Sequence, residues 1–76
     1  MREATIFRIS LKAARVNAGL KQSEAAEALG VDRATLHSYE AGKTIPQWDM
    51  VEKIESLYGV SASNIFFGKQ LALSEH

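Results

Sequence analysis

The chain has 76 residues, with nine basic and nine acidic side chains and no cysteine. This length predicts one small domain, and the lack of cysteine excludes both a disulfide framework and a cysteine-based zinc site. No apolar run approaches the roughly 20 residues that a membrane-spanning helix needs, and the start "MREATIFRIS" does not resemble a secretory signal. We therefore expect a cytoplasmic protein with no membrane partner.

The charge is unevenly distributed along the chain, although the formal net charge is zero. Residues 1–22 carry five bases against the single acid Glu3, whereas acids outnumber bases from Ser23 onward. Net neutrality gives little support to a nucleic-acid partner. A basic N-terminal third is nevertheless compatible with one, because the distribution of charge matters more than its sum.

Apolar spacing, capping residues and glycines predict five short helices, over residues 10–18, 22–29, 33–41, 47–58 and 62–67. Ser10, Asp32 and Ser61 stand where helix N-caps are expected. The position before the second helix holds Lys21, whose side chain cannot accept a hydrogen bond, so this start is predicted to fray or to be rescued by another group.

We divide the chain into an N-terminal arm at 1–9, a helical domain at 10–68 and a C-terminal tail at 69–76. The arm contains "ATIFRI", whose β-branched and aromatic residues are typical of a short strand. Several apolar residues near the two ends exceed what a five-helix core needs, which predicts either a dimer interface or a small terminal sheet. They are Ile6, Phe7, Ile9, Phe67, Leu71 and Leu73. Tyr39, Trp48 and Tyr58 are assigned to the core.

The helices at 22–29 and 33–41 are separated by three residues, which is typical of a helix-turn-helix whose second helix enters the DNA major groove. At 100° per residue, Leu36 and Tyr39 fall on one side of the second helix. Arg33, Ala34, His37 and Ser38 share the other side, and Thr35 lies between the two. That face lacks the mixed Glu and Lys pairs of an ordinary solvated helix.

The run from Gln22 to Thr44, "QSEAAEALGVDRATLHSYEAGKT", resembles the Xre family of regulators, the phage repressor and Cro type. The likeness extends from "LKAARVNAGLKQ" to "LYGVSASNIFFG". It implies an all-α, five-helix, phage-repressor-like fold that binds double-stranded operator DNA, usually as a homodimer on a two-fold site. The sequence departs from the family pattern at Lys21, at Gln47, and at Ala25, where leucine is usual.

The resemblance also assigns candidate residues. Its implied base contacts are Arg33, Ala34, Thr35 and Ser38, with His37 as a flanking candidate and phosphate as an alternative partner for Thr35. Its implied phosphate contacts are Gln22, Lys43 and Thr44, to which we add Lys12. Arg15 and Glu40 match positions of a structural ion pair. The alternative for each of these residues is an ordinary solvated or helix-forming side chain that makes no contact with DNA.

These observations predict a sequence-specific transcriptional regulator, a repressor of phage or mobile-element type. The alternative is an interaction module, such as an antitoxin that neutralises a partner protein, and the neutral charge and apolar termini give it weight. An enzyme is not expected, because no carboxylate pair, nucleophile constellation or phosphate loop is present in the sequence. A lone His without further ligands at suitable spacing predicts no metal site, and no cofactor is expected.

Overall fold

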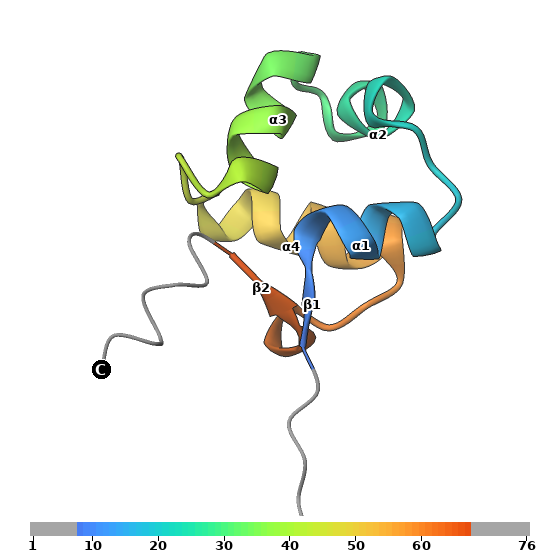
Figure 1. Ribbon diagram of the computed structural model, residues 1–76, viewed down its shortest axis with the longest axis vertical. Helices are drawn as coiled ribbons and strands as arrows, with labels where there is room; N and C mark the ends of the chain where they lie inside the picture. Colours follow the sequence, from blue (N-terminus) through green and yellow to red (C-terminus); the bar gives the residue numbers. More distant parts are fainter. Residues whose placement is uncertain (1–7, 68–76) are drawn as a thin grey trace, which may run out of the picture.

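Four α-helices make up most of the computed structural model, which describes residues 8–67 (Figure 1). Each of the four corresponds to one helix predicted from the sequence, with ends that differ by a residue or two at most. In chain order they are α1 Leu11–Asn17, α2 Gln22–Leu29, α3 Arg33–Ala41 and α4 Trp48–Tyr58.

The fifth predicted helix, at 62–67, is wrong. A single 3₁₀ turn, η1 Ala62–Asn64, occupies its first half, and the chain then becomes extended as strand β2, Ile65–Phe66. Ser61 caps the turn as expected, but Ile65 adopts φ −121° and ψ 136°. The helix stops because tertiary contacts use this segment as a strand. The five-helix count is therefore replaced, among the described residues, by four helices and a strand pair.

The partner of β2 is β1, Ile9–Ser10, and the two strands run parallel. Ile9 pairs with Ile65 and Ser10 with Phe66, so the pair joins the two ends of the described chain. Figure 1 shows this pair on the opposite side of α1 and α4 from α2 and α3. Of the apolar residues assigned to a terminal interface or sheet, Ile9 lies in this pair and Phe67 packs against the core. The others lie outside the described residues.

A tight turn joins α2 to α3. Gly30 ends α2 with φ +79°, a conformation that side chains with a Cβ rarely adopt. The backbone N–H of Val31 then donates to the Ala26 carbonyl at 3.0 Å, as in a Schellman motif. A Cβ at Gly30 would meet no atom within 4 Å. The backbone angle, and not crowding, therefore requires glycine at this turn.

The core lies where the four helices and β2 meet, and its most deeply buried large side chains are Leu29, Leu36 and Ile54. Tyr58 is buried and Tyr39 is half-buried, but the assignment of Trp48 to the core is wrong, because 66% of Trp48 is exposed. Trp48 is the first residue of α4, and the buried face of that helix begins only at Val51.

Candidate nucleic-acid interface

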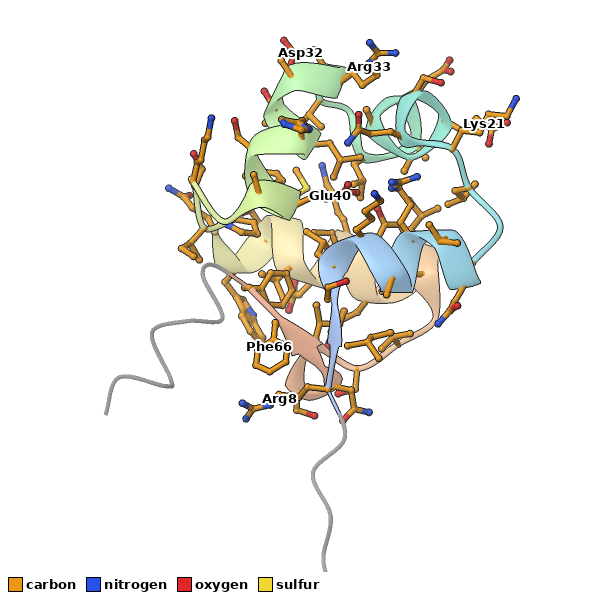
Figure 2. The ribbon with its side chains drawn as sticks, in the orientation of Figure 1. Arg8, Lys21, Asp32, Arg33, Glu40 and Phe66 are labelled. Carbon is orange, nitrogen blue, oxygen red and sulfur yellow. The ribbon has the colours of Figure 1, made fainter. Side chains whose placement is uncertain are left out.

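The start of α3 is fixed by its cap. The Asp32 carboxylate accepts a hydrogen bond from the Thr35 backbone N–H at 2.8 Å, which satisfies one of the free donors of the first turn. The hydrogen bonds from Thr35 lower the pKa of Asp32 below its usual value, since they favour the charged carboxylate. Figure 2 shows Asp32 and Arg33 at the outer end of α3. The helix therefore presents its first turn to solvent.

The side of α3 that faces away from the core carries most of the predicted base contacts. Arg33, Ala34 and His37 are exposed and Ser38 is half-buried, while Leu36 is fully buried on the opposite side. A surface hollow of about 360 Å³ is lined by Gln22, Arg33, Ala34, His37 and Ser38. The structure thus brings together four predicted base contacts and one predicted phosphate contact. Thr35 is half-buried and does not line this hollow.

A second hollow, of about 370 Å³, adjoins the first. Gln22 and His37 belong to both hollows, and Lys12 from α1 lines only the second. Arg15, Glu40 and Ala41 complete its lining. Lys12 is exposed and so lies on the same surface as the predicted base contacts. Three helices, α1, α2 and α3, therefore contribute side chains to one continuous polar surface.

Lys43 and Thr44 lie in the loop that follows α3 and line neither hollow. Both side chains are exposed. Their backbone N–H groups both donate to the Ser38 carbonyl, at 3.0 and 3.4 Å, so the loop is held against the last turn of α3. The structure places these two predicted phosphate contacts beside the C-terminal end of the helix, apart from the other candidates.

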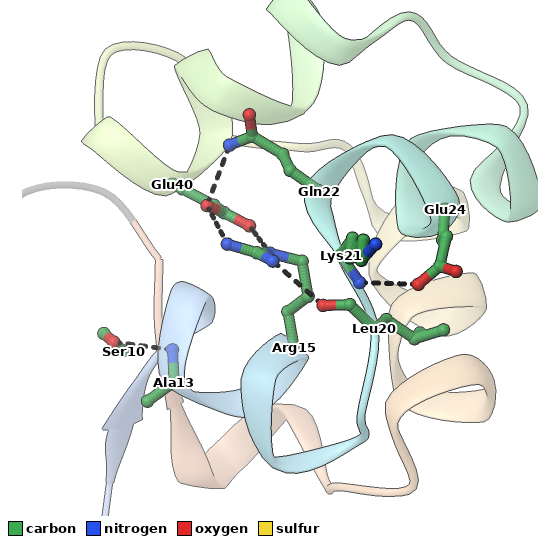
Figure 3. A network of polar contacts seen from close by, with 8 residues as sticks. All are labelled: Ser10, Ala13, Arg15, Leu20, Lys21, Gln22, Glu24 and Glu40. Carbon is green, nitrogen blue, oxygen red and sulfur yellow. Dashed lines mark hydrogen bonds and ion pairs between the residues drawn. The ribbon is translucent and has the colours of Figure 1, made fainter.

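Arg15 and Glu40 form an ion pair beneath this surface (Figure 3). Arg15 Nε donates to Glu40 Oε2 at 2.6 Å, and the two side chains are 9% and 6% exposed. Arg15 also donates to the Leu20 carbonyl at 2.9 Å. The hydrogen bond to Glu40 raises the pKa of Arg15 against the opposing effect of burial. The pair therefore ties α1 and the loop before α2 to the end of α3.

Gln22 joins the same network, which the sequence did not reveal. Its Nε2 donates to Glu40 Oε1 at 3.1 Å, across 18 residues of sequence. This bond fixes the side chain of the first residue of α2 between the two hollows. The sequence marked Glu40 as a partner of Arg15, but nothing in it indicated that the second carboxylate oxygen would hold Gln22.

The start of α2 is rescued in the way the sequence allowed. The Lys21 side chain caps nothing, but the Glu24 carboxylate accepts a hydrogen bond from the Lys21 backbone N–H at 2.8 Å. This is the Glu half of a capping box, and the spacing from Lys21 to Glu24 was a signal for it. Gln22 is the first residue of α2, and the first turn of a helix is a place where backbone N–H groups favour an anion.

The described part of the chain offers no cluster of three or more His, Cys, Asp or Glu side chains suited to a metal ion. Within residues 8–67 there is also no helix of the length and apolarity required to cross a bilayer.

Comparison with known proteins agrees with this geometry. The helix-turn-helix family matches residues 11–65, which covers all four helices. The chain is 30% identical over 70 residues to the cryptic phage CTXphi transcriptional repressor RstR of Vibrio cholerae, an alignment that covers 92% of this chain and 63% of that relative. No solved structure matches the chain at a significant level.

The chain thus spans less than two thirds of the length of this relative. The family match, by contrast, covers well over half of the chain and includes both helices of the motif and the turn between them. The predicted family is confirmed: the chain belongs to the Xre-type helix-turn-helix regulators.

Proposed function

We propose that this protein is a DNA-binding transcriptional regulator that reads double-stranded operator DNA with α3 in the major groove. The observation that carries the proposal is the hollow formed by Gln22 of α2 and Arg33, Ala34, His37 and Ser38 of α3. Side chains that reach base edges must project from one exposed face of the recognition helix, next to the start of the preceding helix.

Each side chain on this face suits a contact with DNA. Arg33 has the planar fork that pairs bidentately with guanine, and the small Ala34 permits close approach and contact with a thymine methyl group. The amide nitrogen of Gln22 has two hydrogens, one of which is engaged by Glu40. The other is free for a phosphate oxygen. Lys12, Lys43 and Thr44 supply further phosphate contacts at the edges of the surface.

We further propose that the protein represses transcription by occupying its operator. The similar Vibrio cholerae protein is named a phage transcriptional repressor, which supports a regulator of phage or mobile-element type. Two copies would bind a two-fold site with half-sites about 34 Å apart. Members of this family are regulators and are typically not enzymes, so we propose no catalytic role for His37 or Ser38.

Selection of bound duplexes from a random DNA pool tests this function and identifies the operator together. We expect enrichment of an inverted repeat whose half-sites are one helical turn apart. A pool that stays unenriched after several rounds would contradict sequence-specific binding.

The salt dependence of DNA binding separates this function from the interaction-module alternative. Of the four phosphate contacts only Lys12 and Lys43 are cationic, so the logarithm of affinity should fall with the logarithm of salt concentration with a slope of about −2 per copy, or about −4 for two copies. A salt slope near zero, together with a DNA pool from which no duplex is selected, would favour the interaction module, which binds a partner protein. Lys53 on α4 is exposed and lines neither hollow, so Lys53→Ala is the charge-matched control for Lys43→Ala.

A further inference from the structure

His37 lies where the two polar hollows meet. Its side chain is exposed on the outward side of α3 and lines both hollows, and Gln22 is the other residue that does so. Histidine is the ordinary side chain whose charge changes between about pH 5 and pH 8. No second histidine lines either hollow. In this pH range the charge of the candidate DNA surface therefore depends on His37.

The charged groups that face His37 come from two helices. Helix α1 contributes Lys12 and Arg15 to the linings, and α3 contributes Arg33 and Glu40. The lining residue from α2 is neutral, and α4 contributes no side chain to either hollow. Arg15 and Glu40 compensate each other as an ion pair. Two cations, Lys12 and Arg33, remain uncompensated, and a protonated His37 adds a third positive charge between α1 and the start of α3.

The one carboxylate within α3 is already occupied. Glu40 follows His37 by three positions, a spacing at which helical side chains are neighbours. Its Oε2 accepts a hydrogen bond from Arg15 at 2.6 Å, and its Oε1 accepts one from Arg15 at 3.3 Å and one from Gln22 at 3.1 Å (Figure 3). The Glu40 side chain is only 6% exposed. A protonated His37 ring, which is exposed, therefore finds its acceptor outside the protein.

We propose that protonated His37 donates a hydrogen bond to an acceptor on DNA, so that each copy takes up a proton as it binds. The neutral ring has one N–H donor, whereas the protonated ring has two and a positive charge. DNA presents acceptors to this surface, namely phosphate oxygens and the O6 and N7 atoms of guanine. An acceptor held against an imidazole favours its charged form. This inference rests on the proposed function, because it requires DNA on this surface.

The consequence is a regulator whose affinity for DNA increases as the pH falls. Uptake of one proton per copy raises the affinity of that copy by at most about tenfold for each unit of pH decrease, because proton binding and DNA binding are linked. The additional positive charge also releases about one more counterion, so the salt slope per copy becomes steeper by about 0.9. Both effects come from one side chain, and they should therefore appear and disappear together.

The test measures affinity between about pH 8 and pH 5.5 for a selected operator half-site and for a duplex of random sequence, at several salt concentrations. For the wild type we expect the half-site affinity to rise by at least about threefold in total, with a steeper salt slope at low pH. His37→Gln keeps a polar side chain that never ionises, so it should remove both effects. His37→Lys is charged throughout, so it should show the steeper slope already at pH 8.

The second histidine of the chain supplies the matched control. It is His76, which lies outside the described residues. His76→Gln removes a histidine without changing either hollow, so its affinity should depend on pH as that of the wild type does. Circular dichroism at both ends of the pH range verifies that every variant is folded.

A wild type that binds DNA equally well at every pH overturns the proposal and leaves the proposed function intact. A pH dependence that survives His37→Gln also overturns it, because another group then takes up the proton. A wild type that binds neither duplex at any pH contradicts the proposed function, and the role of His37 is refuted with it. The two duplexes identify the acceptor. An equal pH effect on both indicates a phosphate oxygen, whereas an effect confined to the half-site indicates a guanine edge.

Discussion

Glu40, near the end of α3, holds two residues from other parts of the chain with its two carboxylate oxygens. Arg15 of α1 donates to Oε2 at 2.6 Å, and Gln22 of α2 donates to Oε1 at 3.1 Å. Counted over the whole residue, Arg15 is 7% exposed, and it is the buried charged residue of the described core. Because a buried charge is tolerated only when it is paired, Glu40 both stabilises the fold and orients a residue of the candidate DNA surface.

Replacing Glu40 by alanine should destabilise the protein strongly. Removing one partner of a buried ion pair leaves the other charge without compensation, at a cost of about 3–5 kcal/mol in unfolding free energy. In a domain of this size each 1 kcal/mol lowers Tm by roughly 4–8 °C. Thermal denaturation followed by circular dichroism measures the loss. Glu52→Ala, at an exposed position on α4, is the control and should stay within about 0.5 kcal/mol of wild type.

The double variant Arg15→Met/Glu40→Leu should be more stable than Glu40→Ala. It removes both charges, and apolar replacement of a buried pair is often neutral or stabilising. An unchanged melting temperature for Glu40→Ala would show that the pair contributes nothing. A double variant as unstable as the single one would show that the shape of the site, and not the unpaired charge, matters.

The Asp32 cap predicts a dependence of stability on pH. Its pKa is lowered in the folded state by the hydrogen bonds from Thr35, so the carboxylate stabilises the fold above the unfolded pKa, which is about 4. That contribution is lost as the pH falls through the lowered pKa. Because other carboxylates titrate in the same range, the measurement is the difference in Tm between wild type and Asp32→Asn from pH 7 down to pH 2. Asparagine still caps but cannot ionise, so the difference should vary below about pH 4; a constant difference would contradict the prediction.

At high pH the buried Tyr58 side chain should make stability fall as the pH rises, the reverse of the effect of Asp32. Burial, followed by the nearby Glu40 charge, raises the pKa of Tyr58 to about 12. Below the unfolded pKa of about 10 the neutral phenol is compatible with the fold, and the stability linked to it is lost as the pH rises toward 12. The Tyr58→Phe variant cannot ionise. Its stability should therefore exceed that of the wild type by a growing margin from pH 10 to 12, measured by urea denaturation.

At neutral pH the same variant tests a buried hydroxyl. Tyr58 is 6% exposed, and its hydroxyl has no hydrogen-bond partner among the described residues. Since an unsatisfied buried hydroxyl is costly, Tyr58→Phe should be neutral or stabilising by about 1 kcal/mol. A loss of more than about 1 kcal/mol would reveal a hydrogen bond to this group.

Arg33→Ala and Lys43→Ala should affect DNA binding in different ways. Loss of a bidentate base contact costs about 1–3 kcal/mol and relaxes specificity at one position of the operator. Loss of a phosphate contact weakens all sequences alike and reduces the salt slope by about one. Binding titrations with the selected operator and its single-base variants, at several salt concentrations, separate the two effects. Equal losses on every sequence for Arg33→Ala would place this arginine on phosphate instead.

The sequence by itself determined the local structure of the four helices. Ser10 and Asp32 accept the capping hydrogen bonds expected of them, because a side chain placed next to a helix start needs no distant partner. The spacing of residues at 100° around α3 also predicted its two faces correctly. Leu36 is fully buried, whereas Arg33, Ala34 and His37 are exposed. Periodicity predicts a buried face wherever a helix packs along its whole length.

The tertiary structure decided the features that helix capping and apolar periodicity do not determine. Ile65 is extended because it pairs with Ile9, 56 positions earlier in the chain, and a helical pattern in residues 62–67 carries no information about that pairing. Trp48 has core spacing relative to Val51 but lies beyond the end of the packed surface, so it is exposed. Gln22 is held by Glu40 only because α2 and α3 meet at that point. In each case the deciding contact joins residues that are distant in sequence, which only the folded chain brings together.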